Sequence, residues 1–409
     1  MDKKLKIFLV AGEPSGDLHG AKLMKEIKLQ FPEVKFYGIG GEKMTELGLN
    51  SFVDIKQISV VGFWEVAKKY IFFKKLLNEC KKFILQNEID LFLPIDYPGF
   101  NIALGKLVKK EGIKVYYYIA PQLWAWASFR AKNLKKAIDK LFVILPFEKE
   151  FFEKYVVDVS YVGHPLLDDN KFSEPILDFS QRENIIAIFP GSRKQEIIRN
   201  LSVLGDIILK IKNELSDYKI GISISNNIDV NIYYNYFKDN NIEINEDKIV
   251  FYYNSRELMQ KAKFGLIKTG TSNLEAALLG LPFIMYYKAS KVNYIIGKNL
   301  LNMESVSLVN IIFEQSNLNF KTDFGDNTIS DNKIKTIKKD NIITEYIQNL
   351  NSNDIIDEIK YFCNNENEFT KFQDYLAKIK EALGNQSASK NLANVIIRDF
   401  AIKINKQSN

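Results

Sequence analysis

The chain has 409 residues, with 56 Lys and Arg against 50 Asp and Glu, so its formal net charge is +6. Its 26% charged and 46% hydrophobic residues are typical of a globular protein, which excludes a peptide, a disulfide-stapled scaffold and a wholly disordered chain. With only two cysteines and two histidines, a reducing compartment is expected and a multi-histidine metal site is not. The 13% aromatic content and basic balance suit an anionic partner, namely a membrane, a nucleic acid or a phosphorylated substrate.

The N-terminal apolar run ends at Gly12, too early for the core of a secretory signal peptide. The longest uncharged stretch, residues 115–129, contains Pro121 and falls short of the roughly 18 apolar residues that a membrane span needs. We therefore expect a cytoplasmic protein whose membrane contact, if any, is peripheral.

In chain order, the first part of the sequence alternates short apolar runs with longer amphipathic ones. Strands are predicted over 6–11, 35–39, 91–95, 114–119, 140–145 and 159–162, and helices over 23–29, 72–85 and 102–110. This alternation predicts βαβ units in a doubly wound parallel sheet.

The same rhythm restarts after a polar stretch at residues 168–184. Further strands are predicted over 185–189, 219–224, 249–252, 264–267 and 282–286, and closing helices over 354–362, 369–383 and 388–402. The sequence thus predicts two Rossmann-like domains. They span residues 1–174 and 175–365, the second with a polar insertion at 314–342, and residues 366–409 form C-terminal helices that pack back on the first domain.

Ligands of such sheets bind beyond the carboxyl ends of strands, so each predicted strand exit is a candidate site. The first exit, residues 12–20, is rich in glycine and acidic groups and opens a helix, which favours an anion or a plain turn. Asp96 directly follows another strand, where it could accept a proton or cap the next helix. Trp124 and Trp126 follow the next strand and could line a sugar or acyl pocket.

Two exits in the second half suit a nucleotide. Gly191, Ser192 and Arg193 could bind a diphosphate through backbone amides and the guanidinium, or form a surface turn. Farther on, Glu275 could accept the ribose hydroxyls of a nucleotide, or form a capping box with Ser272.

A membrane face is predicted where aromatic residues alternate with lysines. The apolar residues of this face are Phe63, Trp64, Tyr70, Ile71, Phe72 and Phe73, and the lysines are Lys68, Lys69, Lys74 and Lys75. Such a face could bind anionic headgroups and insert side chains shallowly, or it could be a core-packed helix with solvated lysines.

Taken together, eight or more motifs in register resemble those of the lipid-A-disaccharide synthase family, inverting glycosyltransferases of the B-type fold. The motifs cover about residues 6–312: 11–20, 59–66, 96–101, 120–126, Arg130, 145–155, 162–166, 190–193 and 269–282. The resemblance implies transfer of diacylglucosamine from UDP-2,3-diacylglucosamine to 2,3-diacylglucosamine 1-phosphate, which yields lipid A disaccharide 1-phosphate and UDP without a metal or other cofactor.

The resemblance also assigns residues. Asp96 matches the general base, and the donor residues are Gly191, Ser192, Arg193, Gly270, Thr271, Ser272, Glu275 and Asn310. Acceptor residues are Glu13, Ser15, Gly16, Asp17, Gln122 and Trp124. The resemblance also implies that the protein binds peripherally to the cytoplasmic face of the inner membrane. We further expect a homodimer and no nucleic-acid partner.

The sequence departs from the family pattern in two places. Val309 replaces a proline before Asn310, and the segment that should follow closely, here residues 344–348 with Glu345 and Gln348, is displaced by the polar insertion. Gly99 replaces an aspartate near Asp96. Two alternatives remain at this point: another UDP-sugar enzyme of the same fold, such as an epimerase, and a non-catalytic nucleotide- or membrane-binding module.

Overall fold

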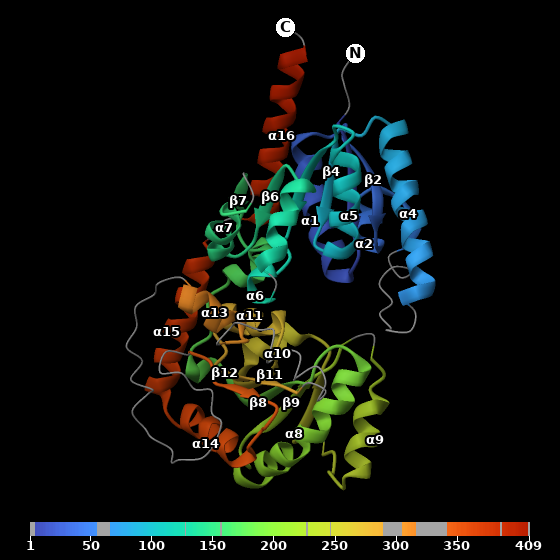
Figure 1. Ribbon diagram of the computed structural model, residues 1–409. Coiled ribbons are helices and arrows are strands. Elements are labelled where there is room, and N and C mark those ends of the chain that lie inside the picture. Colours follow the sequence, from blue (N-terminus) through green and yellow to red (C-terminus); the bar gives the residue numbers. More distant parts are fainter. Residues whose placement is uncertain are drawn as a thin grey trace. The chain divides into compact units, whose positions relative to one another are not determined.

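The computed structural model describes residues 5–54, 66–126, 128–155, 158–225, 228–245, 247–288, 305–315, 342–384 and 387–407. The chain divides into two compact units (Figure 1). The first unit combines Met1–Asn170 with Leu383–Asn409, and the second is Lys171–Ala382. Each unit contains one parallel sheet, as the alternating pattern predicts.

The sheet of the first unit has seven parallel strands in the order β3-β2-β1-β4-β5-β6-β7. The strands are β1 (Lys6–Ala11), β2 (Lys35–Gly40), β3 (Leu49–Asp54), β4 (Leu91–Ile95), β5 (Lys114–Tyr118), β6 (Lys140–Val143) and β7 (Val159–Tyr161). The central strands are almost wholly buried, because helices cover both faces of a parallel sheet.

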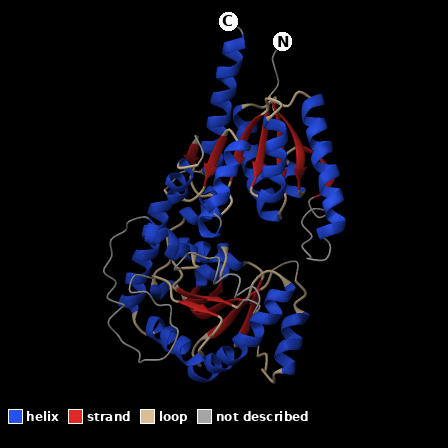
Figure 2. Ribbon diagram, in the orientation of Figure 1, coloured by secondary structure: helices blue, strands red, loops and turns tan. Residues whose placement is uncertain are grey.

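The helices of the first unit pack on both faces of its sheet (Figure 2). They are α1 (Pro14–Gln30), α2 (Glu42–Glu46), α4 (Val66–Gln86), α5 (Pro98–Lys109), α6 (Leu123–Trp126), α7 (Pro146–Glu153) and α16 (Ala388–Gln407). One apolar core joins the strands to α4 and α5. The other joins the opposite face of the strands to α1, α2 and α16.

The C-terminal helix α16 completes this second core. Its side chains Leu392, Ile396 and Phe400 are buried against the sheet face that α1 also covers. Phe400 meets Phe31 edge to face, with ring centroids 5.7 Å apart. At the start of α16, the Asp168 carboxylate accepts hydrogen bonds from the hydroxyls of Ser387 and Ser389. A segment distant in sequence is therefore an integral part of the first unit.

The second unit has a six-stranded parallel sheet in the order β10-β9-β8-β11-β12-β13. The strands are β8 (Glu183–Phe189), β9 (Lys219–Ser223), β10 (Ile249–Tyr252), β11 (Ala262–Lys268), β12 (Phe283–Tyr287) and β13 (Glu345–Ile347). The helices are α8 (Lys194–Glu214), α9 (Asn231–Asp239), α10 (Ser255–Lys261), α11 (Thr271–Leu278), α13 (Leu308–Gln315), α14 (Ser352–Cys363) and α15 (Glu366–Leu383). The two sheets with C-terminal helices confirm the expected fold class.

The unit boundaries differ from the expected ones at residues 174 and 365. The first boundary falls after Asn170, and residues 366–382 belong to the second unit rather than to a C-terminal segment of the first. The reason is aromatic packing by α15. Phe369 lies 5.1 Å from Phe179, and Phe372 lies 5.1 Å from Phe362, measured between ring centroids.

Candidate functional site

Each sheet has one point at which its strand order reverses, and the predicted loops lie at these points. The order reverses between β1 and β4 in the first sheet, and between β8 and β11 in the second. Ligands of open α/β sheets bind beyond the carboxyl ends of strands at such reversals. The loops after β1 and β4 thus frame one candidate site, and the loops after β8 and β11 frame another.

Asp96 leaves β4 with a strained backbone. The φ angles of Asp96 and Tyr97 are 47° and 50°, and Ile119, at the exit of neighbouring β5, has a φ of 64°. Residues with a side chain avoid this left-handed region, and such strain clusters at functional sites. The strained residues mark this edge of the sheet as the part of the first unit most suited to binding or catalysis.

The carboxyl group of Asp96 is a suitable proton acceptor. Burial raises its pKa from 3.8 to about 6, and the charge of Glu13 adds to the increase while the Tyr97 amide opposes it. A carboxylate with this pKa is ionised at neutral pH and is a stronger base than an exposed one. The alternative role as a helix cap is not observed, because the N-cap residue of α5 is Tyr97.

Two side chains hold the backbone at Asp96. The Tyr117 hydroxyl and the Asn101 amide nitrogen each donate to the Asp96 carbonyl, at 2.6 Å. The same Asn101 amide lies 3.3 Å from the carbonyl oxygen of Val10, at the end of β1. Asn101 is fully buried, so its role is to join the two strand ends that frame the site.

The glycine-rich loop after β1 fits closely against this site. A Cβ atom on Gly12 would lie 2.2 Å from the Tyr97 ring, so only glycine leaves room for that ring. Gly16 is buried, whereas Glu13 and Ser15 are exposed. Glu13 is close enough to raise the pKa of Asp96, so the structure brings these two predicted residues together.

Asp17 differs from its expected role as an acceptor contact. Its carboxylate is 5% exposed and accepts hydrogen bonds from the amides of Gly41, Lys43 and Met44 at 2.8, 3.1 and 3.1 Å. These amides belong to the first turn of α2 and the residue before it. Asp17 therefore caps α2, and the carboxylate is occupied by backbone groups.

Trp124 is positioned by a buried carboxylate that sequence reasoning did not single out. The indole Nε1 donates to Glu148 Oε1 at 2.9 Å, while Glu148 Oε2 accepts from the amides of Ile144 and Leu145. Glu148 is 1% exposed, and burial raises its pKa to about 7. Gln122, two residues before Trp124, is exposed.

Both histidines lie in the first unit and are neutral at neutral pH. Burial lowers the pKa of His19 to about 4 and that of His164 to about 3. The His164 Nδ1 atom accepts a hydrogen bond from the Leu166 amide. Proton transfer near neutral pH is therefore better suited to Asp96 than to either imidazole.

A pocket of about 270 Å³ lies at the strand reversal of the second unit. Its lining includes the predicted donor residues Gly191, Ser192, Arg193, Gly270, Thr271 and Ser272. Helix α8 begins directly after Arg193, and backbone amides at a helix N-terminus favour an anion. Gly191 has a φ of 116°, a conformation that favours glycine in this turn. We call this cavity the second-unit pocket.

Six further polar residues, which the sequence analysis did not assign to the donor site, also line the second-unit pocket. These are Glu196, Ser223, Ser225, Ser255, Lys268 and Thr269. Lys268 is the last residue of β11 and therefore sits at a strand exit, which is a signal that the sequence did contain. Glu196 lies in the first turn of α8. Its position beside the loop that precedes the helix can be inferred only when the first residue of the helix is known.

Glu275 is not among the residues that line this pocket. Its Oε1 atom lies 3.0 Å from Nη2 and 3.2 Å from Nε of Arg256, whose guanidinium covers the Phe172 ring at 4.8 Å. The alternative capping box with Ser272 does not form, because the N-cap residue of α11 is Gly270. Glu275 thus differs from both expectations and is engaged by an arginine.

Asn310 and Glu345 lie together across the polar insertion. The Asn310 amide donates to Glu345 Oε1 at 2.8 Å and exchanges hydrogen bonds with the backbone of Ile343. Glu345 also accepts from the amides of Val306 and Ser307, and burial raises its pKa. Asn310 is fully buried, so in this structure it ties the start of β13 to α13 rather than lining a cavity.

The predicted membrane face is only partly described. Phe63 and Trp64 lie outside the described residues. On α4, Phe72 is 37% exposed, but Phe73 turns toward the core and packs against Phe100 with ring centroids 6.1 Å apart. Ile71, which the sequence places in this face, is 73% exposed, so Ile71 and Phe72 lie on the outer face and Phe73 does not.

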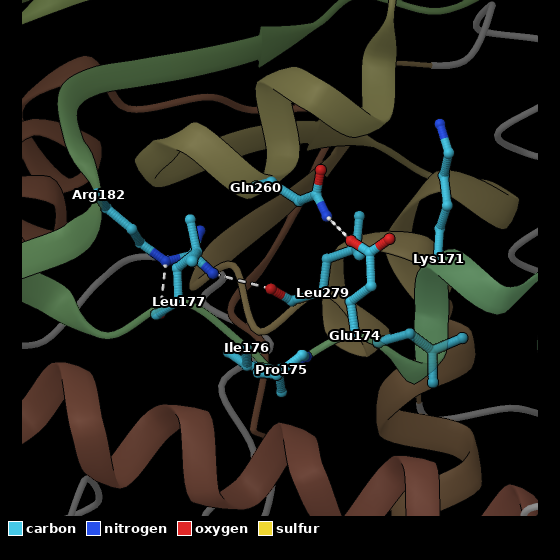
Figure 3. Close-up of a pocket in the computed structure, with 9 residues that line it drawn as sticks. Lys171, Glu174, Pro175, Ile176, Leu177, Arg182, Gln260 and Leu279 are labelled. Carbon is cyan, nitrogen blue, oxygen red and sulfur yellow. Dashed lines mark hydrogen bonds between the residues drawn. The ribbon is translucent and has the colours of Figure 1, made fainter.

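A cavity beside Arg182 is too small to be a substrate site. It holds only about 10 Å³, enough for about one water molecule (Figure 3). Arg182 is 4% exposed and donates to five carbonyl oxygens, those of Leu177, Met259, Ala262, Leu279 and Gly280. These bonds occupy the guanidinium, so Arg182 has a structural role.

Two features are absent from the described parts of the chain. Among those residues, no group of three or more His, Cys, Asp or Glu side chains is arranged to hold a metal ion. Within the same ranges, no helix is both long and apolar enough to cross a membrane.

Solved structures of the same fold include UDP-sugar enzymes. A putative UDP-N-acetylglucosamine 2-epimerase from Listeria monocytogenes aligns over 97% of both chains with a TM-score of 0.59 and 11% identity. The calicheamicin glycosyltransferase aligns over 97% of this chain and 98% of its own with a TM-score of 0.58 and 9% identity. At such low identity these likenesses show the fold alone, and they confirm the B-type architecture.

Sequence comparison identifies the family. The family model described as lipid-A-disaccharide synthetase matches residues 7–389. The lipid-A-disaccharide synthase of Trichlorobacter lovleyi is 31% identical over 96% of this chain and 97% of its own, and that of Syntrophus aciditrophicus is 36% identical over 76% and 82%. The chain therefore belongs to the lipid-A-disaccharide synthase family, glycosyltransferases of lipid A biosynthesis.

Proposed function

We propose that this chain transfers diacylglucosamine from UDP-2,3-diacylglucosamine to 2,3-diacylglucosamine 1-phosphate with inversion at the anomeric carbon. The observation that carries the proposal is Asp96, a carboxylate with a pKa raised to about 6, held at the strand reversal of the first unit. Asp96 removes the proton of the acceptor 6-hydroxyl as that oxygen attacks the anomeric carbon. One base is sufficient for an inverting displacement, because no covalent intermediate forms.

The first unit binds the acceptor in this proposal. Glu13 and Ser15 are exposed on the loop beside Asp96, and Gln122 and Trp124 follow the neighbouring strand β5. Hydroxyl groups of a sugar are recognised by carboxylate, hydroxyl and amide side chains of this kind, and an indole packs on the apolar face of the ring. A Cβ atom on Gly16 would lie 3.3 Å from that of Ala11, so this glycine lets the start of α1 pack closely on the end of β1 and thereby positions the loop.

The second-unit pocket binds the donor diphosphate. The leaving UDP develops negative charge on its phosphate oxygens, which Arg193 and the backbone amides around Gly191 and Gly270 stabilise. Thr271 and Ser272 contribute hydroxyl donors from the start of α11. Glu275 and Asn310 are proposed to support this site from outside the pocket lining, Glu275 through Arg256 and Asn310 through Glu345.

Mass spectrometry of the products tests the reaction. Purified protein with both proposed substrates should form the disaccharide 1-phosphate and UDP in equal amounts, and Asp96→Asn should lower the rate by about two orders of magnitude or more. Turnover of the UDP-sugar without acceptor would favour an epimerase instead. Full activity of the Asp96→Asn protein would refute the role of Asp96.

We also propose that the chain binds peripherally to the cytoplasmic face of the inner membrane through α4. Exposed Ile71 and Phe72 lie next to exposed Lys74 and Lys75 on this helix, a composition that suits anionic lipid. The fraction of protein that floats with liposomes should fall for the double variant Ile71→Ser/Phe72→Ser. The control Ile198→Ser, which changes an exposed apolar side chain on α8, should float like the unmodified chain. Unchanged flotation of the double variant would exclude this face.

A homodimer remains a prediction, to be checked by light scattering.

A further inference from the structure

Three charged side chains form a cluster inside the second-unit pocket. Glu196 Oε1 lies 3.1 Å from Arg193 Nη1, and Glu196 Oε2 lies 3.1 Å from Lys268 Nζ. The side chains of Glu196 and Lys268 are 21% and 20% exposed, whereas that of Arg193 is 75% exposed. One carboxylate thus engages both cations, one on each oxygen. We refer to these residues as the Glu196 cluster.

The cluster lies directly over the loop that follows β8. A Cβ atom on Gly191 would be 3.1 Å from Glu196 Oε2 and 3.6 Å from Cδ of Lys268. Both side chains therefore pass close to the backbone of the turn whose amides favour an anion. Lys268 reaches this place because it ends β11, the strand that pairs with β8 at the reversal of the sheet.

A carboxylate and a phosphate compete for the same donors. Arginine and lysine form charge-assisted hydrogen bonds with either group, and a diphosphate carries more charge and more acceptor oxygens than one carboxylate. With Arg193 and Lys268 both free, two cations would face the incoming phosphates. With both held by Glu196, the carboxylate occupies those donors and repels the ligand.

We propose that Lys268 is a second cationic contact for the donor diphosphate and that Glu196 is an internal anion which the diphosphate displaces from both cations. The inference rests on the proposed donor site in this pocket. It assigns opposite effects to two residues that touch each other, since removing the cation weakens nucleotide binding and removing the carboxylate strengthens it. A merely structural ion pair would give effects of the same sign.

Isothermal titration of the full chain with UDP measures these effects. Lys268→Met should raise the Kd about tenfold, Lys268→Arg should restore most of the affinity, and Glu196→Gln should lower the Kd about threefold or more. The Lys261–Glu257 pair lies on α10, directly before the start of β11, and supplies matched controls with the same charge changes. Lys261→Met and Glu257→Gln should both bind UDP like the unmodified chain.

The outcomes separate the two levels of the proposal. UDP affinity unchanged in Lys268→Met, or weakened in Glu196→Gln with the melting temperature preserved, overturns the inference while the donor site stands. If Lys268→Met does not fold, Lys268→Gln takes its place with the same expected direction. Absence of UDP binding by the unmodified chain overturns the donor site and this inference together.

Discussion

The Asp96 carboxyl group combines a favourable position for chemistry with a cost to stability. Its folded-state pKa of about 6 lies above the ordinary 3.8, so the protonated form is favoured in the folded chain. Stability is therefore lost as the pH rises from about 4 to about 6, by about 3 kcal/mol in total. Above that range the chain carries a buried negative charge whose benefit is catalytic.

Replacing this group should separate the two effects. Asp96→Asn is expected to lose turnover at every pH and to unfold at a higher temperature than the unmodified chain at pH 8, because the amide does not ionise. At pH 5 the difference should be about half as large, and near pH 3, below the pKa of the unfolded chain, the two melting temperatures should converge. Calorimetry at the three pH values measures this. An unmodified chain whose rate does not rise with pH through about 6 would contradict the assignment.

Glu148 provides a second test at the level of one side chain. In Glu148→Gln the amide oxygen can still accept from the Ile144 and Leu145 amides, but the amide NH2 group faces Trp124 Nε1, which is itself a donor. The substitution therefore breaks only the hydrogen bond to Trp124. We expect a higher KM for the acceptor, an unchanged KM for the donor and a loss of about 1–3 kcal/mol in unfolding free energy. Trp124→Phe, which removes the donor instead, should give the same split between the two KM values.

At the scale of elements, Asp17 links α1 to α2. Asp17→Asn leaves one acceptor oxygen for three amides, so we expect a loss of about 1–2 kcal/mol in urea denaturation with the acceptor KM unchanged. Glu42→Gln, an exposed change in the same turn of α2, is the control and should be neutral. A raised acceptor KM for Asp17→Asn at full stability would restore the direct contact that the sequence suggests.

Arg182 joins the ends of α10 and α11 to the start of the second unit. Arg182→Met would leave five carbonyl oxygens without this donor, and the free energy of unfolding should fall by about 3 kcal/mol or more. Lys171→Met is the control: it also removes a positive charge from the lining of the small cavity, but Lys171 is exposed, so the free energy of unfolding should change little. Denaturant titration of both variants makes the comparison.

For the whole molecule, long apolar strands were predictable and short polar ones were not. The bounds expected for β1, β4 and β10 agree with the structure. Strand β3 contains Asn50 and Ser51, and β13 has only three residues after a long polar segment, so neither shows the pattern of a buried strand. Pairing with β2 and β12 makes them strands, and that information is not local.

The candidate sites follow the same rule. Residues near a strand exit, such as Asp96 and Arg193, can be named as candidates because the exit itself is visible in the sequence. The roles of Asp17 and Asn310 could not be predicted, because the backbone groups that hydrogen-bond to these side chains lie on segments distant in sequence. Arg182 gave no signal at all, since a buried arginine amid polar residues looks like a surface one.

The place of α16 in the first unit has a consequence for biosynthesis. Residues 5–170 emerge from the ribosome before the helix that completes the cover of one face of their sheet, so the part of this face that α1 and α2 leave uncovered stays open while the second unit is made. At usual translation rates, of the order of ten residues per second, the delay is roughly tens of seconds. The contiguous second unit can close its core first, and the nascent first sheet is the part of the chain that most needs a chaperone.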